Sequence, residues 1–216
     1  MTFPSPLRVG LGVGVLVLLA AAGSAAADPG IQCEVHRRQV LRVALSVAIG
    51  QTPFDQRAIT RVVEQLWAPE GVGIDWIDEP QASTPERLDA WVVVGRKSAE
   101  AAVTPRPNVR ARIVLISVDE VAARLEQALS LQLQVPRDSV RHLMFGNAHL
   151  IGQSLGYAIA HQLGHSVFGL PHASAGLMSA DYNQLPGLNS VPAAGLDGES
   201  RRILQKRFDV GCVAAR

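Results

Sequence analysis

The chain lacks an excess of either charge. It carries 20 lysine and arginine residues against 19 aspartate and glutamate residues, for a formal net charge of +1. It also has no internal repeat, no low-complexity tract and no shift in composition that would divide it into parts. The charge balance argues against nucleic acid or an anionic membrane as a partner, and the uniform composition favours a single domain.

Cysteine is nearly absent, with only two residues, Cys33 and Cys212, near the two ends of the chain. In an oxidising compartment such a pair is expected to form a disulfide. In the chain-entropy model a loop of this length would stabilise the fold by about 4 to 5 kcal/mol. The alternative is two unpaired, buried thiols.

The amino-terminal segment has an apolar stretch that is short for a membrane span. Arg8 is followed by apolar residues 9–22 and by the small residues 23–27. This layout is typical of a secretory signal peptide cleaved after Ala27, whereas a span needs about 20 apolar residues. We therefore expect a secreted or periplasmic protein whose mature part, residues 28–216, is one domain without a membrane span. An uncleaved anchor is the alternative.

The pattern of apolar residues predicts an α/β fold in which a small twisted sheet packs on helices. Strands are indicated by runs of β-branched and aliphatic residues, and helices by apolar residues at helical spacing. The expected strands are 40–48, 73–77, 90–94 and 112–118. The expected helices are 54–67, one capped by Asp119 and reaching about residue 131, 147–168, and 198–208 with Asp197 as its cap.

The predicted helix 147–168 carries the strongest functional signal. Ile151, Leu155 and Ile159 begin an apolar stripe on it, so most of this helix should be buried. His161 and His165 lie four residues apart on an adjoining face, where two imidazoles can ligate one metal ion.

A third histidine, His172, follows within seven residues and is the nearest candidate for the third ligand of a zinc ion. Alternatively, all three histidines are structural and satisfied by hydrogen bonds, as we expect for His36, His142 and His149. That alternative suits the cluster poorly, because crowded imidazoles in an apolar setting would each need a partner.

The stretch AHQLGHSVFGLPHASAGLMSADY resembles the metzincin zinc peptidases, especially the matrixin-like branch, with its HExxHxxGxxH signature and methionine turn. The resemblance covers about twenty-five residues and implies a zincin-like fold with a central active-site helix. It also implies that the three histidines bind zinc, that Gly169 is the turning glycine and that Met178 lies beneath the metal. Tyr182 lies near the position of the family's switch tyrosine, although its spacing after Met178 is longer than expected.

Two departures from the signature affect this interpretation. First, Gly169 and His172 each come one residue late, an insertion that one more helical residue or a bulge could absorb. Asp181 and Glu199 are therefore alternatives for the third ligand.

The second departure is Gln162, which replaces the catalytic glutamate. In the family that glutamate takes a proton from the attacking water and passes it to the leaving amine. An amide can orient water but cannot accept a proton, and general acid–base groups contribute about 10²- to 10⁴-fold in rate. Asp181 is the nearest carboxylate in sequence that could substitute.

These observations lead to two functional hypotheses. The first is an exported, zinc-dependent metallopeptidase-like protein of impaired activity, which holds a peptide or protein substrate against the edge strand 112–118. The second is a non-catalytic, zinc-binding pseudopeptidase that acts as a peptide- or protein-binding module. An exported α/β domain without metal is a third interpretation.

Overall fold

A computed structural model of the chain describes residues 31–32, 39–47, 54–77, 88–96, 111–180, 195–208 and 213–214. Several predictions lie outside these residues: the signal peptide, both cysteines, His36, Asp181 and Tyr182.

Four parallel strands form the main sheet of the described residues, in the order β3-β2-β4-β5. The strands are β2 (Gln39–Val47), β3 (Val72–Ile77), β4 (Ala90–Gly95) and β5 (Arg112–Ser117). All of β4 is buried, as expected for an inner strand of the sheet, which lies between β2 and β5. The sheet and its helices confirm the predicted mixed α/β class, and all four predicted strands are present within one or two residues.

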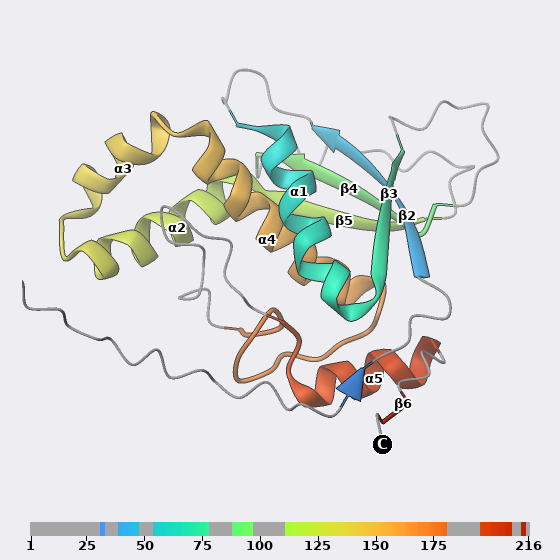
Figure 1. Ribbon diagram of the computed structural model, residues 1–216. Helices are drawn as coiled ribbons and strands as arrows, with labels where there is room; N and C mark the ends of the chain where they lie inside the picture. Colours follow the sequence, from blue (N-terminus) through green and yellow to red (C-terminus); the bar gives the residue numbers. More distant parts are fainter. Residues whose placement is uncertain are drawn as a thin grey trace, which may run out of the picture.

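The helices are α1 (Gln56–Trp67), α2 (Val118–Leu133), α3 (Arg137–Phe145), α4 (Ala148–Ser166) and α5 (Gly198–Phe208), with a 3-10 turn at Ala68–Glu70. Helices α1 and α4 pack against each other over the sheet, while α2 and α3 extend to one side and α5 lies below (Figure 1). Among the described residues, no helix is both long enough and apolar enough to cross a membrane.

Two glycines of α4 allow this helix to approach α1 closely. A Cβ added at Gly152 would lie 2.5 Å from the carbonyl oxygen of Asp55, and one added at Gly156 would lie 2.7 Å from that of Ile59. Both distances are far below ordinary contact, so the two backbones touch where only glycine fits. This contact, together with the apolar stripe that begins with Ile151 and is buried throughout, holds α4 in the core.

Capping residues explain where the helices begin. Asp55 accepts hydrogen bonds from the N–H groups of Arg57 and Ala58, so α1 begins after it. The Asp55 carboxylate also pairs with His149 at 3.0 Å, which lowers the pKa of Asp55 and gives His149 the structural role predicted for it.

The structure corrects the predicted start of α2. Its cap is Ser117, whose Oγ accepts from the N–H of Glu120, and not Asp119, which lies within the first turn. Strand β5 therefore passes into α2 without a loop. Helix α3 was not predicted at all. The predicted cap of α5 is confirmed, because Asp197 accepts from the N–H of Ser200.

A buried carboxylate anchors α5 to the rest of the fold. Glu70, whose side chain is 2% exposed, receives two hydrogen bonds of 2.8 Å from Arg201 and a third from the N–H of Leu196. Charge-assisted, bidentate bonds of this kind are the strong ones. Helix α5 thus lies beside the turn that leads into β3.

The two ends of the described chain meet in a short antiparallel pair, β1 (Ile31–Gln32) with β6 (Val213–Ala214). Gln32 pairs with Val213, and these residues are the sequence neighbours of Cys33 and Cys212. The cysteines themselves lie outside the described residues. The pairing supports the predicted disulfide, which stays a prediction.

Candidate metal centre

Three histidines come together at the end of α4. The Nε2 atoms of His161 and His165 are 3.0 Å apart, and the ring of His172 lies 4.5 Å from that of His165 and 5.5 Å from that of His161. One ring nitrogen from each lies within 4.8 Å of the other two, close enough to hold a metal ion. His161 is 2% exposed, whereas His172 is exposed. The cluster is therefore buried on one side and open to solvent on the other.

The other ring nitrogens of the two helical histidines bind backbone carbonyls. His161 Nδ1 lies 2.8 Å from the oxygen of Leu177, and His165 Nδ1 lies 2.7 Å from that of Leu170. A carbonyl can only accept, so each Nδ1 carries the hydrogen and each Nε2 of the neutral ring keeps a lone pair. Two lone pairs then face each other at 3.0 Å, an arrangement that is stable when a metal ion or a proton lies between them. Such outer hydrogen bonds are typical of histidines that bind metals.

The turn that follows α4 brings the third histidine back to the helix. Gly169 has φ of +65°, which side-chain-bearing residues rarely adopt, and its N–H binds the carbonyl of His165. The N–H of Phe168 bonds to the carbonyl of Leu163, five residues back. This wider, π-type turn accommodates one more residue between His165 and Gly169 than a regular helix end would need.

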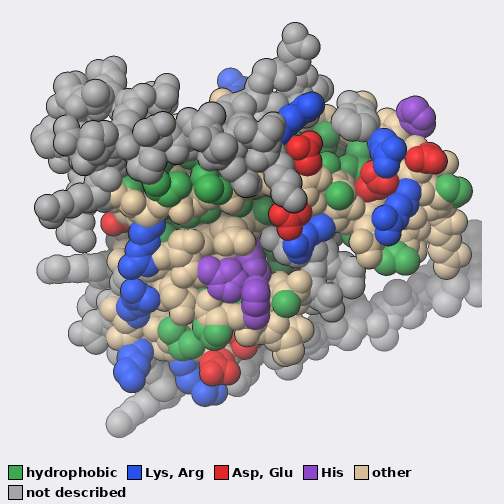
Figure 2. Space-filling model, turned by 180° about the vertical axis from the view of Figure 1, so that it is seen from behind, with side chains coloured by type: hydrophobic (Ala, Val, Ile, Leu, Met, Phe, Trp, Pro, Cys, Tyr) green, Lys and Arg blue, Asp and Glu red, His purple; other side chains and the backbone are tan. Residues whose placement is uncertain are grey.

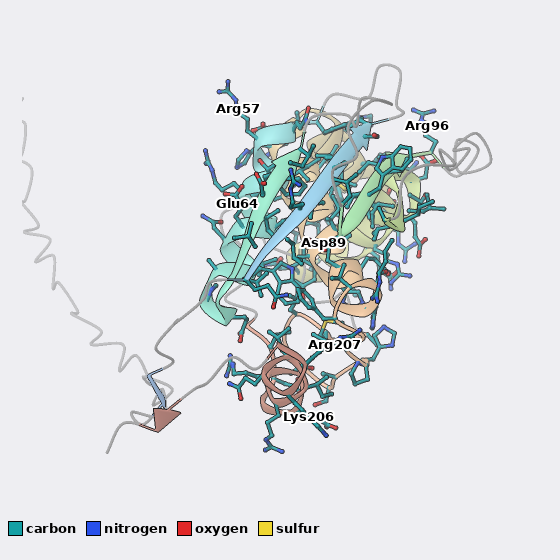
Figure 3. The ribbon with its side chains drawn as sticks, turned by 90° about the vertical axis from the view of Figure 1, so that its right-hand side faces the viewer. Arg57, Glu64, Asp89, Arg96, Lys206 and Arg207 are labelled. Atoms are coloured by element: carbon teal, nitrogen blue, oxygen red, sulfur yellow. The ribbon has the colours of Figure 1, made fainter. Side chains whose placement is uncertain are left out.

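Two arginines cap the carboxyl end of α4. Arg112 of β5 donates to the carbonyls of Ser166 and Val167, the latter at 2.9 Å, and Arg207 of α5 donates to that of Phe168 at 2.7 Å. Arg207 is labelled in Figure 3 on α5, beside the end of α4. Cations at this end satisfy free carbonyls and complement the helix dipole. They fix the helix end from which the histidines project.

The loop before Met178 is anchored at a second glycine. Gly176 has φ of +77°, and a Cβ added there would lie 2.4 Å from the carbonyl oxygen of Gly195. That carbonyl accepts the N–H of Leu177 at 3.1 Å, and the hydroxyl of Tyr157 donates to the carbonyl of Gly176 at 3.3 Å. The Leu177 carbonyl that orients His161 is thereby held in place.

Met178 packs directly on α4 beside the histidines. It is fully buried, and a Cβ added at Gly164 would lie 2.4 Å from its Sδ and 2.9 Å from its Cε. Met178 thus packs against α4 at Gly164, the residue before His165. Its place beneath a metal stays a prediction.

We expect Gly164→Ala to destabilise the fold by about 1 to 3 kcal/mol, the usual cost of forcing an extra carbon into a packed core. Chemical denaturation measures the free energy of unfolding. Gly146→Ala is the matched control, because a Cβ there meets nothing closer than 3.8 Å at a negative φ. If the two variants were equally stable, the packing of Met178 against Gly164 would not require a glycine there.

Burial is the main cause that lowers the pKa of His161, because it penalises the charged ring. The hydrogen bond to Leu177 opposes this shift, while the charges of His165, His172 and Arg124 add to it. A lowered pKa keeps the imidazole neutral as the pH falls below the ordinary histidine value. Neutral imidazole is the form that binds a metal, so proton competition is reduced at this ligand.

A cleft of about 330 Å³ opens beside the histidines. Gln162 lines it, half-buried, next to His161 and His172. Figure 2, from behind, shows histidine side chains gathered at one place on the surface. The remaining lining residues come from β5, α2, α4 and the loop after α4: Leu115, Ile116, Ser117, Glu120, Val121, Arg124, Ala158 and Ala180.

Most of the predicted site residues therefore meet: the three histidines, Gln162 and Met178. Among the described residues, the three histidines form the group that can hold a metal. Glu199, the alternative third ligand, is exposed on α5 and does not belong to this group. Sequence reasoning missed Glu120 and Arg124, which reach the cleft from α2. The pattern Ser117-x-x-Glu120 signals a helix start, but nothing local connects it to a histidine forty residues later.

The comparisons with known proteins found no match: no family model, no curated protein and no solved structure is similar enough to identify a relative.

Proposed function

We propose that the protein binds one zinc ion through His161, His165 and His172 and is a metallopeptidase-like hydrolase of low activity. The observation that carries this proposal is the facing pair of Nε2 lone pairs, 3.0 Å apart, whose rings are oriented by carbonyls on their far sides. Two zinc ligands at ~2.0 Å in tetrahedral geometry lie about 3.3 Å apart. The two nitrogens need to separate by only a few tenths of an ångström.

The donor set suits zinc. Three neutral imidazoles, with one side open to solvent, match a catalytic zinc site, which keeps a position for water. When bound, zinc supplies a water of lowered pKa and polarises a carbonyl group. The resemblance of the sequence to metzincins supports the same assignment, as do the positive φ of Gly169 and the packing of Met178 on α4.

The cleft provides room for a peptide beside the histidines. Strand β5 ends the order of the sheet among the described residues, and its residues Leu115, Ile116 and Ser117 line the cleft. An extended peptide can bind by adding a strand to such an edge. Gln162, also in the cleft, can orient a water by hydrogen bonding but cannot take its proton.

A second function is favoured by Gln162 itself. Without a base, the same site would bind a peptide or protein and release it unchanged, as a pseudopeptidase. The two functions share the metal and the cleft, and differ in whether a bound peptide is cleaved.

Metal analysis tests the shared part of the proposal. Native mass spectrometry of protein equilibrated with zinc should show one ion per chain, and chelation should lower the thermal midpoint, because the folded state binds the metal better than the unfolded state. Incubation with a mixed peptide library then separates hydrolase from binding module. Absence of bound zinc, together with an unchanged midpoint on chelation, would overturn the metal assignment.

A further inference from the structure

The cleft contains a carboxylate that the sequence motif does not include. Glu120, in the first turn of α2, lines the same cleft as His161, Gln162 and His172. Of the described residues that line this cleft, Glu120 is the acidic one. Gln162 stands where the metzincin signature has its catalytic glutamate, and its amide cannot accept a proton. The carboxylate of Glu120, which lines the same cleft, can accept one.

The backbone of Glu120 is held firmly. Ser117 is the last residue of β5, pairs with Gly95 of β4, and caps α2 through the hydrogen bond from the N–H of Glu120 to its Oγ. Strand and helix join there without a loop. The sheet thus fixes the position of the Glu120 Cα atom. The same sheet packs against α4.

The carboxylate of Glu120 keeps freedom to move. It pairs with Arg124, one helical turn later, at 2.5 Å, and the two side chains are 61% and 42% exposed. An exposed ion pair of this kind contributes little free energy, so the Glu120 carboxylate can leave Arg124 for another partner at little cost. Arg124 also lines the cleft beside His161 and His172, so this pair lies near the histidines.

The other acidic residues of this region have different roles. Glu70 is buried against Arg201 and Asp55 caps α1, both away from the cleft. Among the remaining polar residues of the cleft, His161 and His172 are the proposed zinc ligands. Ser117 and Gln162 do not accept protons at neutral pH, and Arg124 is a cation.

We propose that Glu120 is the general base of this site, in place of the residue at position 162. The inference rests on the proposed peptidase function. An O–H bond of the attacking water breaks and its proton passes to the Glu120 carboxylate, while the water oxygen bonds to the peptide carbonyl carbon, whose π electrons move to oxygen. When the C–N bond breaks, Glu120 returns the proton to the leaving nitrogen, so that one water is consumed.

The test compares zinc-loaded wild type, Glu120→Gln, Gln162→Glu and the double variant on a set of fluorogenic peptides. Glu120→Gln is expected to lower kcat by about 10²-fold or more. Zinc content, and the Kd of a labelled peptide measured by fluorescence anisotropy, should stay unchanged. In the Gln162→Glu background, where a second base is present, the effect of Glu120→Gln should shrink to a few-fold at most.

Asp119→Asn is the matched control, because it removes a carboxylate from the same helical turn at an exposed position that does not line the cleft. Its turnover should equal that of the wild type. Zinc-loaded wild type without turnover, or Glu120→Gln with full turnover, would overturn the role of Glu120 and leave the metal site intact. Absence of zinc from every variant would instead show that the proposed function itself fails.

Discussion

Replacing His172 or His161 by alanine is expected to abolish zinc binding at micromolar metal. Each substitution removes one of three ligands, and even the loss of an outer hydrogen-bonding partner costs about 10- to 100-fold in metal affinity. We therefore expect a loss of at least about 100-fold, measured by competition with a chromophoric chelator. The thermal midpoint of either variant should no longer respond to chelation.

Comparing His161→Ala with His172→Ala separates the loss of zinc binding from a loss of folding stability. His161 is buried and bonds to the Leu177 carbonyl, so its loss also leaves a buried acceptor unpaired. His172 is exposed and can be truncated without opening the core. His142→Ala, at an exposed position of α3, is the matched control and should bind zinc like the wild type. Undiminished affinity in His172→Ala would mean that two histidines and another group form the site.

Changing Gln162 to glutamate should produce the largest gain. The new carboxylate stands on the cleft wall beside His161, where it can take a proton that the amide cannot. General acid–base catalysis typically contributes about 10²- to 10⁴-fold. The rise in kcat/KM for peptide hydrolysis should reach this range in the Glu120→Gln background, where no other base is present, and should be smaller in the wild type, where Glu120 already serves. Product release from a fluorogenic peptide, with zinc-loaded protein, measures it.

Gln127→Glu controls for the added charge, since it makes the same substitution at an exposed position of α2 outside the cleft. Its activity should remain at the wild-type level. An inactive Gln162→Glu variant that still binds zinc would indicate that the cleft does not present a peptide to the metal, and would favour the binding module.

Much of the fold was predictable because its signals are local. The apolar stripe of α4 and the β-branched runs of the strands reflect burial at fixed periods, and each reappears in the structure. The histidine spacing likewise specified one helical face. Helix α3 had a weaker signal because it is only nine residues long. Its residues Val140, Leu143 and Met144 recur at helical spacing over little more than one turn, and Pro136 before it makes no side-chain cap.

The site was predictable to the same extent. Its three histidines, Gly169 and Met178 lie within eighteen residues of sequence, and their geometry follows from one helix and one turn. Glu120 could not be assigned, since its place depends on the parallel pairing of β4 with β5 and on the packing of α2 against α4. Such placements arise from tertiary packing, which no short pattern encodes.

The closeness of the three ligands in sequence has a consequence for how the metal stabilises the protein. His161 and His172 are separated by only eleven positions, so the entropy needed to bring them together in an unfolded chain is small. The denatured protein should then keep some affinity for zinc, and the rise in stability on adding zinc should be smaller than the affinity of the native site implies. By the same reasoning, zinc can close the turn after α4 early in folding, before the sheet has formed.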